Sequence, residues 1–392
     1  MGTVATNPAN TAEGMKGEKD QSNREAIDPT MADPPPAKLD AGALFVLKSE
    51  GSWLHCGYHL TTSIVAPALL SLPLALASLG WAAGVFCLFI AAAVTFYSYN
   101  LISLVLEHQA KLGRRQLRFR DMAHQILGPS WARYYIGPIQ FMVCFCAVVG
   151  NVLLGGQTMK SMYLIEKPEG TMKLYEFVVI FGAFMLVLAQ LPSFHSLRHI
   201  NLLSLILCLA YSACATGGSI YIGHSSQAPS RDYSLPSDKV DLIFGIFNAI
   251  AIIATCYGNG IIPEIQVYLQ PTNEVLEGVF ANPEKGQHSA RNVIPRILFR
   301  SISVVAATVI GAMLPFFGDI NAFMGAFGFL PLDFVVPAVV YNITFRPSPR
   351  GSVFWINTTI AAVFSVLTVV ASVAAVRQIA LDAKNYKLFA NV

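Results

Sequence analysis

Two interrupted apolar stretches decide the fold of this chain: SIVAPALLSLP at residues 63–73 and YGNGIIPE at residues 257–264. Both belong to apolar runs long enough to cross a membrane as helices. In the first, Pro67 and Pro73 each remove a backbone donor and clash with the preceding helical turn. In the second, two glycines weaken the helix and Pro263 stops it. We therefore predict two broken membrane helices.

Irregular backbone at membrane depth is tolerated only where it is buried in protein or lines a cavity, so we expect the two stretches to face one another. Half-helix N-termini attract a carboxylate, and half-helix C-termini attract an ammonium group or a cation. The arrangement suits a small zwitterion, with glycines leaving room for it. The alternative is that Pro and Gly kink these helices without function. The predicted site residues are Ile64, Ala66, Pro67, Ala68, Leu69, Leu70, Ser71, Tyr257, Gly258, Asn259 and Gly260.

The composition around these stretches is that of a membrane protein. Hydrophobic residues make up 54% of the 392 residues and charged residues only 12%, about half of the ~25% that is usual in soluble proteins. The net charge of +3 gives no electrostatic argument for a nucleic-acid partner. Long continuous apolar runs favour helices over a barrel, so we predict an all-α polytopic membrane protein. Nine windows qualify as spans: 53–79, 81–106, 134–163, 174–192, 200–222, 240–263, 293–314, 320–345 and 353–376.

The distribution of Lys and Arg predicts the orientation in the membrane. Residues 1–44 contain no aromatic side chain and are predicted to be a disordered cytoplasmic tail, ahead of a transmembrane domain over 45–392. With a cytoplasmic N-terminus, the inner segments hold 18 Lys and Arg residues and the outer segments hold 7. The odd span count then puts the C-terminus outside. On this topology the glycosylation triplets at Asn342 and Asn357 flank a cytoplasmic turn, so we predict that neither carries sugar.

Two acidic residues are candidates for coupling or gating. Asp333 lies between two prolines in the window 320–345, where it could bind a proton, although we favour a helix cap. Glu264 directly follows the second break and could bind a proton or gate the inner mouth; alternatively, it simply reaches water at the span end. No metal site is expected, because His55 and His59 lack further ligands and the cysteines lack paired spacing.

Signatures of catalysis are absent from the sequence. It contains no Gly-rich phosphate-binding loop, no Gly-x-Ser-x-Gly elbow and no His-Glu-x-x-His pair. We therefore expect neither an ATP-driven pump nor an enzyme, and no cofactor.

The interrupted stretches themselves carry a family resemblance. APALLSLP at 66–73 and YGNGIIPEIQ at 257–266 resemble the amino acid/auxin permease family. YLQPTNEVLE at 268–277, AFGFLPLDF at 326–334 and LDAKNYKLF at 381–389 resemble its plant GABA-transporting branch. The resemblance implies a LeuT-type helical bundle with broken first and sixth spans. It also implies proton-driven symport of GABA and related ω-amino acids at the plasma membrane, with the proton as coupling ion.

That resemblance divides the domain into a first repeat over 45–223, an incomplete second repeat over 240–345, and a last span and tail over 353–392. The chain departs from the family pattern after Gln266, where the sequence continues directly with Val267 instead of the segment that the family has there. The seventh span and nearly all of the eighth are missing, which amounts to roughly 50–70 residues. This explains nine windows where the family has eleven spans. The alternative function is a truncated, transport-deficient isoform that acts as a membrane protein without transport or modulates a full-length partner.

Overall fold

The computed structural model describes residues 67–114, 116, 118–190, 198–225, 234–235, 237–258, 280–282, 284, 286 and 288–385. These residues all belong to one compact unit, residues 39–392. The predicted disordered tail over 1–44 lies outside the described residues, as does the first part of the window 53–79.

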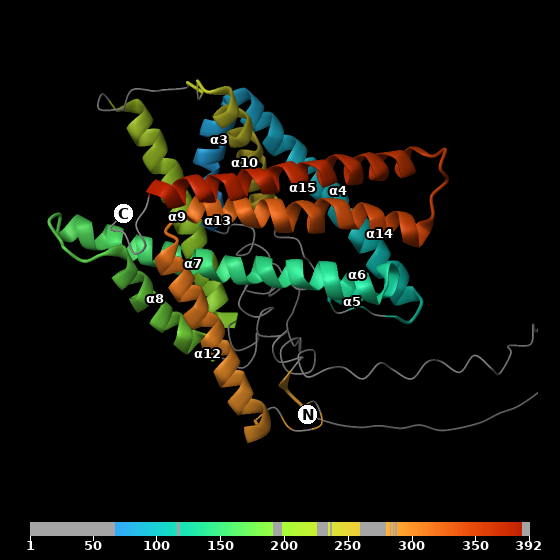
Figure 1. Ribbon diagram of the computed structural model, residues 1–392, viewed down its shortest axis with the longest axis horizontal. Coiled ribbons are helices and arrows are strands. Elements are labelled where there is room, and N and C mark those ends of the chain that lie inside the picture. Colours follow the sequence, from blue (N-terminus) through green and yellow to red (C-terminus); the bar gives the residue numbers. More distant parts are fainter. Residues whose placement is uncertain are drawn as a thin grey trace, which may run out of the picture. The chain divides into compact units, whose positions relative to one another are not determined.

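The described part of the chain is helical throughout, without a strand (Figure 1). Most elements are α-helices; η1 is a 3₁₀ helix, and η2 and η5 are π-helices. The elements are η1 (Pro67–Ser71), α3 (Leu72–Leu79), α4 (Trp81–Lys111), α5 (Phe119–Leu127), α6 (Pro129–Trp131), η2 (Ala132–Ile136), α7 (Gly137–Glu166), α8 (Leu174–Leu188), α9 (Arg198–His224), α10 (Lys239–Tyr257), α12 (Ala290–Met313), α13 (Phe317–Met324), η5 (Gly325–Val335), α14 (Val336–Phe345) and α15 (Ser352–Asn385).

Every predicted window contains an apolar helix. Seven helices within the described ranges are long and apolar enough to cross a membrane: Trp81–Lys111, Pro129–Glu166, Leu202–His224, Lys239–Tyr257, Ala290–Met313, Phe317–Phe345 and Ser352–Lys384. Two shorter apolar helices, Ala68–Leu79 and Leu174–Leu188, occupy the other two windows. The prediction of an all-α polytopic membrane protein is confirmed, whereas the number of spans and the LeuT-type arrangement stay predictions.

Several boundaries differ from the predicted ones, and three regions illustrate the differences. The last helix does not end near residue 376 but continues to Asn385, because Arg377 reaches α10 and Gln378 donates to Asp382 one turn further on. The interval between the predicted windows 81–106 and 134–163 contains the amphipathic helix α5, whose Phe119 and Met122 are fully buried. The helix in the window 174–192 is shorter and ends at Leu188.

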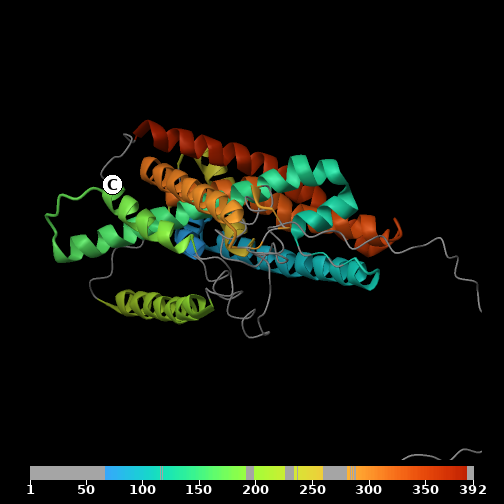
Figure 2. The ribbon, with the colours of Figure 1, turned by 90° about the horizontal axis from the view of Figure 1, so that it is seen from below.

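The most buried span is the rod formed by α13, η5 and α14. It packs along α15 and against α10 (Figures 1 and 2), and 78% of its most apolar window is buried. Pro331 lies inside the π-helical segment, where it lacks the N–H that an α-helix would use. A wider helical turn in mid-span is often found at functional sites. The most buried span therefore contains an irregular segment. The sequence predicted this span only as the continuous apolar window 320–345.

The two glycosylation triplets meet inside the protein. The Tyr97 hydroxyl donates to Asn357 Oδ1 at 2.7 Å, and Asn357 Nδ2 donates to Asn342 Oδ1 at 2.8 Å. Asn357 is fully buried, and both amides are engaged with each other. This geometry supports the prediction that neither asparagine carries sugar, because a buried, hydrogen-bonded amide cannot enter a transferase.

We expect endoglycosidase treatment to leave the electrophoretic mobility of the protein unchanged. We also expect Asn357→Ala to lower the free energy of unfolding by about 1–3 kcal/mol, because the partly buried Tyr97 and Asn342 lose their hydrogen bonds to this fully buried amide. Thermal unfolding in detergent measures the second effect. Asn100→Ala is the control, since the Asn100 amide bonds only to Phe96 of its own helix. Equal loss of stability in the two variants would contradict the structural role of the Tyr97–Asn357–Asn342 chain.

Candidate functional site

The described parts of the two interrupted stretches lie together. The Cys256 thiol, in the last turn of α10, donates to the carbonyl oxygen of Ala68 in η1 at 3.4 Å. The helix α10 also packs along α3, which continues the first stretch. The first stretch thus packs beside the last turn of α10, directly before the second stretch, and the expectation that the two stretches face one another across a site stays a prediction. The segments that complete both stretches lie outside the described residues, and with them Ile64, Ala66, Asn259, Gly260 and Glu264.

Asn321 of α13 joins the first stretch to the last turn of α10. Its Nδ2 donates to Ser71 Oγ at 2.7 Å, and its carbonyl oxygen accepts from Thr255 Oγ1 at 2.6 Å. All three residues are buried, with exposed fractions of 2% for Asn321, 4% for Ser71 and 2% for Thr255. Buried side chains that hydrogen-bond across helices hold membrane bundles together. The sequence reading missed Asn321, although an amide within the apolar window 320–345 was a signal that could have found it.

The prolines of the first stretch mark where helical segments begin. Pro67 is the first residue of η1, and Pro73 lies in the first turn of α3, where its missing donor costs nothing. The Ser71 hydroxyl makes no cap bond to α3 and accepts from Asn321 instead. Leu70 is about half exposed, so its side chain points away from this contact. The described part of the first stretch is therefore a junction between a 3₁₀ helix and an α-helix.

The end of α10 carries a carbonyl that α4 engages. The hydroxyl of Tyr99 donates to the backbone carbonyl of Tyr257 at 2.9 Å. Tyr257 is the last residue of α10, and the carbonyls of a final turn lack partners within the helix. Tyr99 uses one lone pair of this oxygen, and a carbonyl oxygen has a second lone pair that can accept a further hydrogen bond or cation contact. Tyr99 was not among the predicted site residues.

Gly258 does not provide space for a ligand in this structure. A Cβ atom built on it would lie 2.5 Å from Cβ and Cγ of Phe329 in η5. The prediction that this glycine leaves room for substrate is therefore wrong here: the missing side chain lets Phe329 approach the backbone. Phe329 is itself almost fully buried.

We expect Gly258→Ala to destabilise the protein by about 1–3 kcal/mol, because Phe329 must leave its position. Adding Phe329→Gly should remove that clash, because both nearest atoms belong to the Phe329 side chain, so the cost of Gly258→Ala should be much smaller in the Phe329→Gly background than in the wild type. Thermal unfolding of the four variants measures this coupling. Additive effects would show that Gly258 and Phe329 do not limit each other.

Asp333 lies at the centre of the irregular segment. Its exposed fraction is 0%, and neither carboxyl oxygen has a hydrogen-bond partner among the described residues. The preferred sequence interpretation, a helix cap, is wrong, because Asp333 sits inside η5 and its carboxyl accepts no backbone N–H there. A buried carboxylate without a partner is costly, so a neutral, protonated carboxyl is the form that this environment accepts. The role of Asp333 in coupling stays a prediction.

No group of three or more His, Cys, Asp or Glu side chains could hold a metal ion within the described ranges. The described site thus consists of η1, the last turn of α10, Asn321 on α13, Tyr99 on α4 and the π-helical segment. Helix ends and small polar side chains such as these can bind a zwitterion without covalent chemistry.

Comparison with known proteins gives one family. The family model described as "Transmembrane amino acid transporter protein" matches residues 49–267 and 260–378. GABA transporter 1 of Arabidopsis thaliana is 54% identical over 434 aligned positions, which cover 90% of this chain and 96% of that protein. Lysine histidine transporter-like 1 of the same plant is 24% identical, with 87% and 91% covered, and lysine histidine transporter-like 6 is 26% identical, with 86% and 93% covered. No solved structure matches the chain.

These alignments support an internal gap. Since 90% of 392 residues is about 353 residues, about 80 of the 434 positions aligned with GABA transporter 1 have no counterpart in this chain. The two matches to the family model meet at residues 260–267, the same place where the sequence predicts an interruption after Gln266. That the missing residues are the seventh and eighth spans stays a prediction.

Proposed function

Because this chain belongs to the transmembrane amino acid transporter family, we propose that it is a secondary active transporter that carries GABA and related ω-amino acids into the cell with protons. The relative with 54% identity is named as a GABA transporter, which supports the substrate. The observation that carries the mechanism is the junction of η1 with the end of α10, bridged by Asn321. Membership of this family makes the chain a membrane transporter protein and not an enzyme.

The substrate would bind between the two interrupted stretches. Its carboxylate would meet the N–H groups of the first stretch, and its ammonium group the carbonyl end of α10 around Tyr257. GABA separates these two charges by three methylene groups, so the site would have to span a longer zwitterion than an α-amino acid. Glu264 and Asp333 are the predicted coupling carboxyls. We place the transporter in the plasma membrane, with a cytoplasmic N-terminus and an extracellular C-terminus, from the bias of Lys and Arg.

Uptake into proteoliposomes tests the proposal. Labelled GABA should accumulate when an inward proton gradient is imposed, and a protonophore that collapses the gradient should abolish accumulation. An inward sodium gradient at equal pH is the matched control for the coupling ion. An excess of an unlabelled α-amino acid should compete less well than an unlabelled ω-amino acid. Accumulation driven by sodium alone would overturn the proton coupling and leave the transporter assignment intact.

One observation favours a second candidate function, a truncated isoform that does not transport. About 80 aligned positions of the GABA-transporting relative are missing, and none of the most apolar window of α9 is buried in the structure. A span in this state lacks the neighbours that usually cover its small and polar faces. Such a chain could reach the membrane and associate with a full-length partner instead of moving substrate.

An experiment that restores the missing segment distinguishes the two candidate functions. The corresponding residues of GABA transporter 1 would be inserted between Gln266 and Val267, and surface labelling would confirm equal delivery of both forms. If only the restored chain takes up GABA, the result supports the interpretation of the unrestored chain as a transport-deficient isoform. Equal uptake by the two chains supports the symporter and makes the segment dispensable.

A further inference from the structure

One carboxyl group lies within the most buried span and has no group to balance a charge. Asp333 is 0% exposed, and neither of its carboxyl oxygens has a hydrogen-bond partner among the described residues. Its chain neighbours Leu332 and Phe334 are also buried, and the Phe334 ring stacks on that of Phe364 in α15 with 4.6 Å between the ring centres. The carboxyl is therefore enclosed by apolar packing, which accepts its neutral, protonated form.

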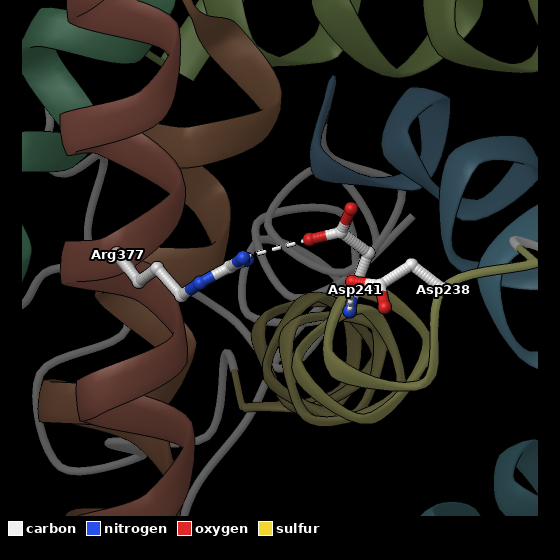
Figure 3. A network of polar contacts seen from close by, with 3 residues as sticks. All are labelled: Asp238, Asp241 and Arg377. Carbon is white, nitrogen blue, oxygen red and sulfur yellow. Dashed lines mark hydrogen bonds and ion pairs between the residues drawn. The ribbon is translucent and has the colours of Figure 1, made fainter.

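The charged side chains on the elements packed against η5 lie towards the ends of those elements. They are Glu107 and Lys111 on α4, Lys160 and Glu166 on α7, Lys239 and Asp241 on α10, Asp319 on α13, and Arg377, Asp382 and Lys384 on α15. The other titratable side chains there are Cys87, Tyr97, Tyr99, His108, Cys144, Cys146, Tyr163, Cys256, Tyr257 and Tyr341. Arg377 donates to Asp241 at 2.7 Å (Figure 3). Within the described part of the chain, none of these groups bonds to Asp333, so a bound proton accounts for a neutral site without a counter-ion.

The segment that carries Asp333 also contacts the end of α10. Phe329 lies four positions before Asp333 in η5, which is about one turn of a π-helix. A Cβ atom built on Gly258, the residue that follows α10, would lie 2.5 Å from Cβ and Cγ of Phe329. Phe329 thus packs against the backbone next to Tyr257, whose carbonyl oxygen belongs to the candidate substrate site. A movement of η5 around Asp333 therefore reaches that site through Phe329.

Loss of the proton changes which packing is stable. A carboxylate at this position needs water or a cation, because the burial of an unpaired charge is costly. Hydration of Asp333 requires η5 to separate from a neighbouring helix, and Phe329 would then shift from Gly258, since packed helices switch between discrete arrangements. On the proposed topology this span runs from outside to inside. Asp333 then lies on the cytoplasmic side of the contact between Phe329 and Gly258.

We propose that Asp333 carries the coupling proton, and that the contact between Phe329 and Gly258 transmits its protonation state to the substrate site. This inference rests on the proposed symport and deepens it, since it selects one of the two predicted coupling carboxyls and names the route to the substrate. In the packed state the carboxyl holds a proton taken from outside. When the site opens inwards, the O–H bond breaks and the proton leaves to cytoplasmic water. The hydrated carboxylate remains and takes its next proton from outside after the carrier resets.

Infrared spectroscopy of the purified full chain tests the proton site without any transport. The wild type at neutral pH should show the carbonyl stretch of a protonated carboxyl, at the high frequency typical of a carboxyl group without hydrogen bonds. Asp333→Asn should lose this band and keep the fold, because asparagine has nearly the shape of a neutral aspartic acid. Asp238→Asn is the control, since Asp238 is an exposed helix cap and asparagine caps equally well. A wild type without the band, or an unchanged band in Asp333→Asn, overturns the proton site.

Equilibrium binding of labelled GABA at two pH values tests the route. The wild-type affinity should be about tenfold higher at the lower pH, and Asp333→Asn should lose this dependence. Phe329→Leu should keep the infrared band but lose most of the pH dependence, because leucine cannot fill the contact with Gly258. Phe323→Leu is the matched control, since the Phe323 ring packs on Phe327 of the same span with 4.6 Å between the ring centres. Full pH dependence in Phe329→Leu overturns the transmission through this contact.

Proteoliposomes distinguish a failure of this inference from a failure of the proposed function. In Asp333→Asn, accumulation of GABA driven by a proton gradient should fall about tenfold or more. Exchange of labelled for unlabelled GABA should persist, because the neutral amide resembles the loaded carboxyl. If the wild type accumulates GABA with protons and Asp333→Asn does so equally well, the inference fails and the proposed function stands. If the band is lost as expected but the wild-type chain moves no GABA, the proton site stands and the proposed function fails.

Discussion

The variant Gly325→Ala should fail to accumulate as a folded protein. Gly325 is the first residue of η5, and a Cβ atom there would overlap the backbone carbonyl of Ala251 and lie 2.6 Å from Thr255 Oγ1. The backbones of η5 and α10 thus touch at this point, and a main chain cannot swing aside as a flexible side chain can. Overpacking of a core usually costs about 1–3 kcal/mol, and the need to separate two buried helices should exceed that range.

Fluorescence-detected gel filtration and thermal unfolding in detergent measure the effect. Gly217→Ala is the matched control, because Gly217 lies in α9 and a Cβ atom there would meet nothing within 4 Å. Alanine favours a helix over glycine by about 1 kcal/mol, so the control should be unchanged or slightly stabilised. A Gly325→Ala protein as stable as the control would show that η5 and α10 do not pack this closely.

The variant Asn321→Leu should lower the affinity for GABA by about tenfold, since loss of a buried hydrogen bond that leaves a partner unsatisfied costs about 1–3 kcal/mol. Leucine keeps a similar volume but removes the amide that bonds Ser71, so the first stretch is no longer tied to α13. The substrate would then have to order a site that the wild type holds ready, and this cost appears as weaker binding.

Equilibrium binding of labelled GABA to the purified protein measures this effect and does not require transport. Ser71→Ala should weaken binding similarly, and the double variant should be little worse than either single one, because both remove the same bond. Asn151→Leu is the control, since the Asn151 amide bonds only to Ala147 in its own helix. Equal losses in Asn321→Leu and Asn151→Leu would mean that amide replacement in a span is harmful in general. Wild-type affinity in Asn321→Leu would exclude the bridge from the binding site.

Much of the architecture could be predicted from local sequence. Each of the nine apolar windows contains an apolar helix, because partitioning into lipid depends on about 20 consecutive side chains and little else. The errors lie where helix ends are set by contacts, as at Asn385, where Arg377 and Asp382 find partners that let the helix continue. Pro73, which was predicted to break a helix, instead lies in the first turn of α3, and the residues before Pro67 lie outside the described part of the chain.

The candidate site could be predicted only in outline. The expectation that two interrupted stretches meet follows from the cost of unpaired backbone in lipid. The bridge made by Asn321 could not be predicted in this way, because Ser71 and Asn321 are separated by 250 positions and no local pattern links them. Gly258 shows the opposite error. The space beside this glycine was predicted to hold substrate, whereas in the fold Phe329 occupies it.

The sequence by itself determined that this protein is a helical membrane protein and a member of an amino acid transporter family, whereas the two interrupted spans stay a prediction. These properties depend on short stretches of chain, whose balance of apolar, glycine and proline residues acts locally. Only the tertiary structure decided that Asn321 bridges Ser71 and Thr255, that neither carboxyl oxygen of the buried Asp333 has a hydrogen-bond partner among the described residues, and that the most buried span contains a π-helical segment. The environment of a polar side chain is set by whichever helices pack around it, and that packing is a property of the whole chain.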